Sequence, residues 1–257
     1  MTALPAGNDA VNPENAWQAS GFAQWRALFR RELAGAFLAP MSYLVWAVFL
    51  IASGYLFATS VRDGAPASLD GTFMSMGLLL LFVCPLLTMR LIAEERKQGT
   101  LELLLTDPTL EGLIVTSKYA AALAVFTAML TPTLAYPLVL TAIGQPDLGP
   151  VVCGYLGLWL LGGLFLAVGL LASSLTQNQI AAASLSFTVL LLLWALARAA
   201  DSVAPGTLHD VLAYISAFTR FADFLRGLVD TRALVYFVSG TALCLYGARL
   251  NLGLVRL

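Results

Sequence analysis

Residues 90–118, RLIAEERKQGTLELLLTDPTLEGLIVTSK, decide the fold of this chain, because they place a dense charged block between two long uncharged runs. The runs at 71–89 and 119–146 contain no Asp, Glu, Lys or Arg. A helix of about 20 apolar residues is long enough to cross a bilayer, whereas the block Glu94-Glu95-Arg96-Lys97 is costly to place in hydrocarbon. We therefore expect a charged segment at a membrane surface, between two membrane spans.

The composition of the whole chain supports this interpretation. It is 59% hydrophobic and 11% charged, whereas soluble domains contain roughly 25% charged residues. Because every backbone polar group in lipid must be paired within its own segment, the spans should be helices. We predict an all-α polytopic membrane protein with six spans, near residues 41–60, 72–92, 118–143, 151–173, 180–200 and 232–249.

The sequence divides into three parts. Residues 1–20 are polar and contain two prolines, which predicts a flexible cytoplasmic tail. Residues 21–38 predict an interfacial amphipathic helix, and residues 39–257 predict a six-span membrane domain.

The segment at 21–38 carries aromatic residues on one helical face and arginines beside it, which suits a helix lying among lipid headgroups. The residues that we assign to this surface are Trp25, Arg26, Phe29 and Arg30. The alternative is a simple extension of the first span, but Gly35 and Pro40 favour a break between the two.

A second amphipathic segment precedes the last span. Residues 208–228 predict one or two short helices on the outer face, or dipping into it, with Val211, Ile215, Phe218 and Leu225 on one apolar stripe. The alternative is a solvated connector without a role in transport.

Basic residues set the expected orientation. With the amino terminus inside, nine Lys and Arg residues fall on the cytoplasmic side and five outside, which favours both termini in the cytoplasm. We expect a multi-pass protein of the inner (cytoplasmic) membrane.

Prolines and glycines within the spans carry structural information. Pro85, the cluster at 131–133 and Pro137 predict kinks, which are tolerated when neighbouring groups satisfy the freed carbonyls. The fourth span contains five glycines. Because glycine permits close approach of membrane helices, this span should be packed inside its own bundle.

The charged segment contains helix signals of its own. We expect the second span to continue as a helix through Glu94 and Arg96, with Gly99 in the left-handed conformation just past its end. Thr100 and Asp107 can cap the two helices that follow. The pattern predicts a helix, a short transverse helix and a helix that enters the third span; the alternative is a solvated charged cap.

The motif TMRLIAEERKQGTLELLLTDPTLEGLIVTSKYAAA at 88–122 resembles the cytoplasmic segment of ABC type-2 transporter permeases. Pro40 with Tyr43, and LLASSLTQNQIAAA at 170–183, add to the resemblance. It covers nearly the whole chain from Trp25 and is greatest for the gliding-motility (GldF-like) subgroup.

The resemblance implies an interfacial helix, a coupling helix that docks on an ATPase subunit, and re-entrant outer helices. Residues matching the ATPase-coupling region are Glu94, Glu95, Arg96, Lys97, Gly99, Thr100, Glu102, Thr106 and Asp107. A secondary cytoplasmic contact is implied for Thr176, Gln177 and Asn178. The partners to expect are ABC ATPase subunits, membrane lipid and a second permease subunit, which would meet the first and fifth spans near Trp46 and Trp194.

Absent motifs limit the chemistry of the chain. The sequence has no GxxxxGK[ST] loop and no Gly-Lys pair, so ATP and Mg should be bound by the partner ATPase, and the chain itself needs no cofactor. The single histidine, His209, argues against a multi-histidine metal site, and nothing indicates a nucleic-acid partner. We expect no catalytic residues.

The sequence is compatible with three functions. The first is a permease subunit that couples ATP hydrolysis to substrate movement or mechanical work. The second is a platform that passes ATPase motion to an extracytoplasmic accessory protein without moving a solute. The third, a membrane enzyme, would have to use Asp201, His209 and Asp210 on one connector, without an ionisable partner elsewhere.

Overall fold

The computed structural model describes residues 21–62, 68–100, 111–144, 147–203, 206–228 and 230–255. These residues form helices and no strand, which confirms the predicted all-α class. The elements are α2 (Gly21–Leu38), α3 (Pro40–Arg62), α4 (Asp70–Thr88), α5 (Ala93–Lys97), α7 (Glu111–Leu130), the 3-10 helix η1 (Thr131–Leu134), α8 (Ala135–Ile143), α9 (Leu148–Leu175), α10 (Gln179–Ser202), α11 (Thr207–Ile215), α12 (Ala217–Leu225) and α13 (Thr231–Val255).

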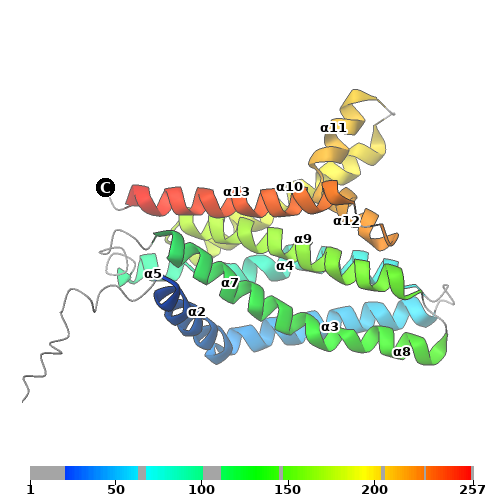
Figure 1. Ribbon diagram of the computed structural model, residues 1–257, viewed down its shortest axis with the longest axis horizontal. Coiled ribbons are helices and arrows are strands. Elements are labelled where there is room, and N and C mark those ends of the chain that lie inside the picture. Colours follow the sequence, from blue (N-terminus) through cyan, green and yellow to red (C-terminus); the bar gives the residue numbers. More distant parts are fainter. Residues whose placement is uncertain are drawn as a thin grey trace, which may run out of the picture.

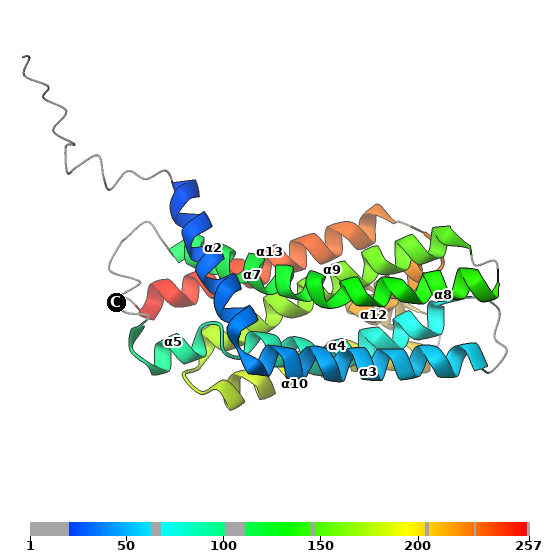
Figure 2. The same cartoon turned by 90° about the horizontal axis from the view of Figure 1, so that it is seen from below.

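Six helical stretches are long and apolar enough to cross a membrane, at Pro40–Val61, Asp70–Lys97, Glu111–Ala142, Leu148–Leu175, Gln179–Ala200 and Thr231–Leu254. This number confirms the six predicted spans. Helices α3, α4, α7, α9 and α13 run along the long axis of the molecule, whereas α2 crosses that axis obliquely (Figures 1 and 2).

Helix α9 is the centre of the bundle. It packs against α4, α7, α10, α12 and α13, and 67% of its most apolar stretch is buried, against 17% in α10 and in α13. A Cβ atom at Gly162 would overlap the buried ring of Phe126 on α7. The prediction that glycines pack the fourth span inside its bundle is therefore confirmed, because the side chain that glycine lacks would displace α7.

The third span is interrupted where the proline cluster predicts it. Helix α7 ends at Leu130, η1 follows, and α8 continues the same span. Pro137 has no N–H to offer the carbonyl of Thr133, and the Tyr155 hydroxyl of α9 donates a hydrogen bond of 2.6 Å to that oxygen instead. Helix α4, by contrast, continues through Pro85 to Thr88.

The interfacial segment differs in one detail from the prediction. Gly35 lies inside α2, and the chain breaks only at Ala39, with Pro40 as the first residue of α3. The predicted break at Pro40 is confirmed, whereas the prediction that Gly35 helps to break the helix is wrong. The position before a proline disfavours the helical conformation, which gives the break its physical reason.

The segment before the last span forms two short helices, but the single apolar stripe expected along it is wrong. Ser216 separates α11 from α12 and its hydroxyl caps α12 at the Thr219 N–H. Phe221 and Phe224 of α12 are buried in the core, whereas Val211 of α11 is 49% exposed. Figure 1 shows that α11 projects away from the bundle, whereas α12 lies against the bundle.

Candidate functional site

The charged segment begins with a break in the helix that precedes it. Helix α4 ends at Thr88, and α5 starts at Ala93 after a turn, so the predicted continuous helix through Glu94 and Arg96 is wrong. Ser173 of α9 causes the difference: its hydroxyl accepts hydrogen bonds from the backbone N–H of Ile92 (3.2 Å) and Ala93 (3.0 Å) and donates to the carbonyl of Met89 (3.2 Å). One buried hydroxyl thus uses its donor and both its acceptor positions to redirect the chain.

The next residue of α9 holds the other side of α5. The guanidinium of Arg96 donates to the Ser174 carbonyl at 3.0 Å, and the amide nitrogen of Asn251 on α13 donates to the same oxygen. This carbonyl lies in the last turn of α9, where no intrahelical donor is available. Arg96 therefore completes the end of α9 while it fixes α5 to α9 and α13.

A buried lysine joins α5 to two further helices. Lys118 of α7 has its Nζ atom 3.0 Å from Glu32 Oε1 of α2 and 2.8 Å from Glu95 Oε1 of α5. Its side chain is 2% exposed, and those of Glu32 and Glu95 are 15% and 17% exposed. A lysine this deeply buried requires ionic partners, so the pairing fixes the relative positions of α2, α5 and α7. We call Glu32, Glu95 and Lys118 the charge triad.

The α4–α5 turn also contributes to a small apolar cluster that is separate from the main core. Its members are contributed by the α4–α5 turn, α7, α9 and α13, and they are Ile92, Ile114, Val115, Leu170, Ala248 and Leu252. Because their apolar surface is removed from water only when these elements stay together, the cluster adds a non-directional contribution to the same assembly.

The four interfacial residues lie on α2 as expected. The rings of Trp25 and Phe29 stack with centroids 5.3 Å apart, and Arg26 and Arg30 are exposed. Helix α2 packs along α7, and no residue of α2 is fully buried. Its position beside α5 depends on Glu32, a residue outside the predicted set.

Gly99 has a φ of +70°, so its predicted left-handed conformation past the end of α5 is confirmed. The hydroxyl of Thr100 donates to the Glu95 carbonyl at 3.3 Å, while Lys97 is exposed. The remaining predicted coupling residues, Glu102, Thr106 and Asp107, lie outside the described residues.

The predicted secondary contact lies beside α5. Thr176, Gln177 and Asn178 form the connection between α9 and α10, and α5 contacts both helices. Asn178 caps α10 by accepting from the Ile180 N–H at 2.9 Å, and Thr176 accepts from the Asn178 N–H at 3.1 Å. The structure thus brings Glu94 to Thr100, 176–178 and α2 to one end of the bundle, which we call the α5 end.

Sequence reasoning missed the residues that hold this end together. Glu32, Ser173, Ser174 and Asn251 were not among the predicted site residues. A usable signal existed for the triad: Glu32 is the only acidic residue of α2, and Lys118 lies two turns inside an otherwise apolar stretch of α7. Such residues need partners of opposite charge.

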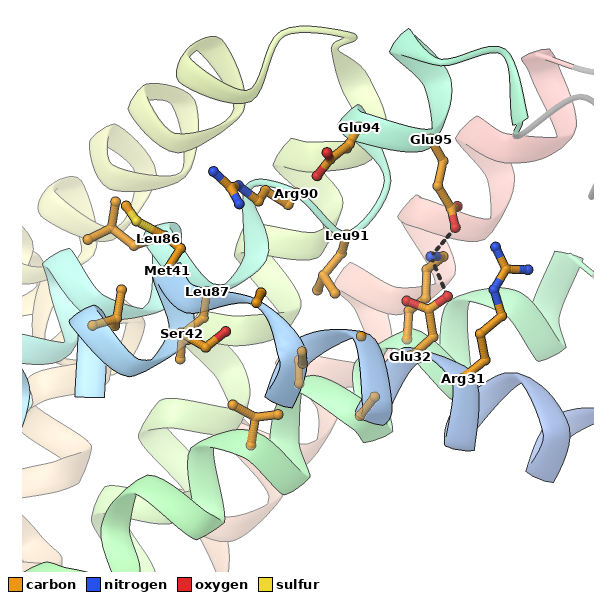
Figure 3. Close-up of a pocket in the computed structure, with 18 of the residues that line it drawn as sticks. Arg31, Glu32, Met41, Ser42, Leu86, Leu87, Arg90, Leu91, Glu94 and Glu95 are labelled. Carbon is orange, nitrogen blue, oxygen red and sulfur yellow. Dashed lines mark ion pairs between the residues drawn. The ribbon is translucent and has the colours of Figure 1, made fainter. Parts of the chain in front are cut away.

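A pocket of about 440 Å³ opens between α2, the start of α3, the end of α4, α5 and α7. Figure 3 shows Arg31, Glu32, Arg90, Glu94 and Glu95 around it, with the dashed ion pairs of the triad on one side. Apolar side chains of α3, α4 and α7 form the rest of its wall. Among the described residues, no group of three or more His, Cys, Asp or Glu side chains could hold a metal ion.

The sequence profile of a family described as ABC-2 family transporter protein matches residues 47–233. The match includes α4, α5, α7 and α9 and therefore most of the α5 end; it begins after α2. A search of curated proteins found no match.

Proposed function

The chain belongs to the ABC-2 transporter family and is a multi-pass permease subunit that works with an ABC ATPase subunit, and on this premise we propose that its α5 end is the surface that receives the motion of that ATPase. ATP and Mg are then bound by the ATPase. The observation that carries the proposal is the fixation of α5: this segment of five residues is bonded directly to α7 and α9, and through Lys118 and the Ser174 carbonyl it is joined to α2 and α13.

The physical argument concerns rigidity. A helix of five residues is too short to be stable on its own in water, so α5 depends on its tertiary contacts. Because the α4–α5 turn and the first residue of α5 together make three hydrogen bonds with Ser173, and Glu95 of α5 pairs with the buried Lys118, a push on α5 moves several membrane helices as one body. Rigid-body displacement of packed helices is an established way to transmit conformational change.

Exposed groups at the same end supply the docking surface. Lys97 of α5 is exposed, and so are Gln177 and Asn178 of the α9–α10 connection, which lies at the same end of the bundle. Charged and polar groups at an interface set orientation and partner choice. The membrane then separates this cytoplasmic end from an outer end that carries α11 and α12, and we propose that both termini are cytoplasmic and that the membrane is the inner membrane.

We also propose that the working unit contains a second permease subunit. Helices α3 and α10 both contact α4, and the three lie along one side of the bundle in Figure 2. Large apolar side chains on that side are exposed, including Ile51 (73%), Phe82 (58%) and Leu192 (60%). This supports the predicted contact through the first and fifth spans, with a copy of the chain or with a related chain.

The motif at 88–122 also leads us to propose that the chain is of the gliding-motility (GldF-like) subgroup. The alternative function is a platform, because a coupling segment and outer helices serve a transporter and a platform alike. A platform would pass the motion of α5 to an extracytoplasmic accessory protein through α11 and α12, and a transporter would use it to move a substrate. ATP-dependent flux in vesicles that contain the complete complex separates them, because only a transporter moves a solute.

The docking proposal is tested with residues that are exposed and lie outside the charge triad. We expect Lys97→Glu to weaken co-purification with the ATPase about tenfold or more, since like charges at an interface cost several kcal/mol. Arg226→Glu, at an exposed position of the opposite end, is the matched control. If Lys97→Glu combined with Asn178→Lys leaves both co-purification and ATPase activity unchanged, the α5 end is not the docking surface.

A further inference from the structure

The pocket at the α5 end has features that the coupling role does not use. Its charged wall combines Arg31 of α2, Arg90 of the α4–α5 turn and Glu94 of α5 with the charge triad. Its other wall is apolar and is built from α3, α4 and α7. In Figure 3 Arg90 and Glu94 lie on the same side of the pocket, above Leu87 and Ser42.

The charges of the pocket are left incompletely paired. Lys118 is shared by Glu32 and Glu95 through one oxygen of each, which leaves the triad with one excess negative charge. The second oxygen of Glu95, Oε2, is buried and has no hydrogen-bond partner among the described residues. Leaving such an oxygen unsatisfied is costly, so a donor that enters the pocket would be stabilised there.

Glu94, Arg31 and Arg90 add further negative and positive charges that are weakly paired. From the described residues the side chain of Glu94 accepts one long hydrogen bond of 3.4 Å, donated by Gln98. Neither Arg31 nor Arg90 forms an ion pair with another described residue. The pocket thus offers acceptors for a cation and, for an anion, two guanidinium groups that have no ion pair among the described residues. The formal charges of its six ionisable residues (three basic and three acidic) sum to zero.

The apolar wall of the pocket would contact the apolar part of such a ligand. Val45, Ala121 and Val125 are buried, and with Leu87 they line the side of the pocket that faces along α3, α4 and α7, the membrane-spanning helices. A volume of about 440 Å³ lies within the roughly 300–1,000 Å³ of small-molecule pockets. Headgroup-like charges at one wall and hydrocarbon at the other are the chemistry of an amphiphile.

We propose that this pocket binds a membrane phospholipid whose headgroup carries a primary ammonium, of the phosphatidylethanolamine class. The ammonium donates to Glu94 and to the free oxygen of Glu95, and the phosphate pairs with Arg90 and Arg31. The first part of the acyl chains lies against Val45 and Leu87. The lipid supplies the donor that Glu95 lacks and stabilises the junction between α2, α5 and α7.

The test uses the purified full-length chain without an ATPase, so that its result is independent of coupling. After delipidation in detergent, phosphatidylethanolamine, phosphatidylcholine and phosphatidylglycerol with identical acyl chains are titrated and bound lipid is counted by native mass spectrometry. We expect about tenfold preference for phosphatidylethanolamine over phosphatidylcholine, because a trimethylated nitrogen has no N–H to donate to the carboxylates. Equal binding of the two in the unaltered protein, or preference for phosphatidylglycerol, would overturn the proposal.

Variants locate the site. Glu94→Gln should lower phosphatidylethanolamine binding to the level of phosphatidylcholine, and Arg90→Gln should lower both, because both lipids carry the phosphate. Arg26→Gln, an exposed arginine of α2 outside the pocket, should change neither. Unaltered lipid selectivity in Glu94→Gln contradicts the assignment, and displacement of the lipid by millimolar glycerophosphoethanolamine would mean that a soluble headgroup compound is the ligand.

Discussion

Replacing Lys118 by methionine tests whether the charge triad holds the α5 end together. Methionine keeps most of the length and the apolar character of the lysine stem, and it lacks the ammonium group. The carboxylates of Glu32 and Glu95, which are 15% and 17% exposed, then face each other without the shared cation. We expect this single change to destabilise the protein severely.

The magnitude follows from the burial of the group. Removing one partner of a buried ion pair costs about 3–5 kcal/mol, because the remaining charge is left uncompensated. The two glutamates retain some contact with solvent, so we expect the lower end, about 3 kcal/mol. For a chain of this size each kcal/mol shifts the midpoint of thermal unfolding by about 2–4 °C, which gives a decrease of about 6–12 °C.

The assay is thermal unfolding in one detergent, followed by intrinsic fluorescence. The matched control is the triple variant Lys118→Met, Glu32→Gln, Glu95→Gln, which removes all three charges at nearly constant volume. Replacing a complete buried ion pair by neutral groups is often close to neutral in stability, so the triple variant should recover most of the loss. If Lys118→Met alone is as stable as the triple variant, the triad carries no structural role and the reasoning is wrong.

Three further predictions address the packing and topology of the bundle. Gly169→Val should cost more than about 3 kcal/mol and lower the yield of folded protein, because a Cβ atom at Gly169 would overlap Thr88. Tyr155→Phe should cost about 0.5–1.5 kcal/mol in chemical unfolding, since it removes the hydrogen bond that the Tyr155 hydroxyl donates to the Thr133 carbonyl. In a variant without native cysteines, Asp147→Cys should be labelled by a membrane-impermeant maleimide applied to intact cells, because Asp147 begins α9 at the end opposite Ser173.

Each of these predictions has a matched control. Gly35→Ala, in an exposed helix position with no atom within 4 Å of the added Cβ, should be neutral or slightly stabilising. Tyr246→Phe, at an exposed side chain of α13, should be neutral. Thr176→Cys, at the α5 end, should be labelled only after the cells are opened; labelling of Thr176→Cys but not Asp147→Cys in intact cells would reverse the proposed orientation.

Much of the fold could be predicted because hydrocarbon imposes strong rules on sequence. The long uncharged runs predicted six spans, and the glycines of α9 predicted its central position in the bundle. Gly99 predicted the left-handed residue that follows α5. These signals are local: each depends on residues within one segment of the chain and on the medium around it. The motif at 88–122 gave the location of the candidate site for the same reason.

The arrangement within the site could not be predicted, because it depends on pairs far apart in the sequence. Ser173 accepts hydrogen bonds from Ile92 and Ala93, which precede it in the sequence by 81 and 80 positions. The residues of the second span themselves do not predict a helix break at this point. Glu32 and Lys118 lie far apart in the sequence, on α2 and α7, and nothing within either segment indicates that the two side chains pair. The prediction of one apolar stripe along 208–228 was wrong for a different reason. It assumed one continuous helix, whereas Ser216 ends α11 and begins α12, and the chain changes direction there.

The same long-range pairs explain how the α5 end can act on the rest of the molecule. Helix α9 carries Ser173 and Ser174 in its last turn and packs, along its length, against α4, α10, α12 and α13. Gly157 of α9 lies so close to Phe224 of α12 that a Cβ atom there would be 2.7 Å from the phenylalanine side chain. Interfaces this tightly packed resist gradual deformation and favour discrete alternative arrangements. Under the proposed function, a displacement applied at α5 would reach α12, at the other end of the bundle, through the one buried helix α9.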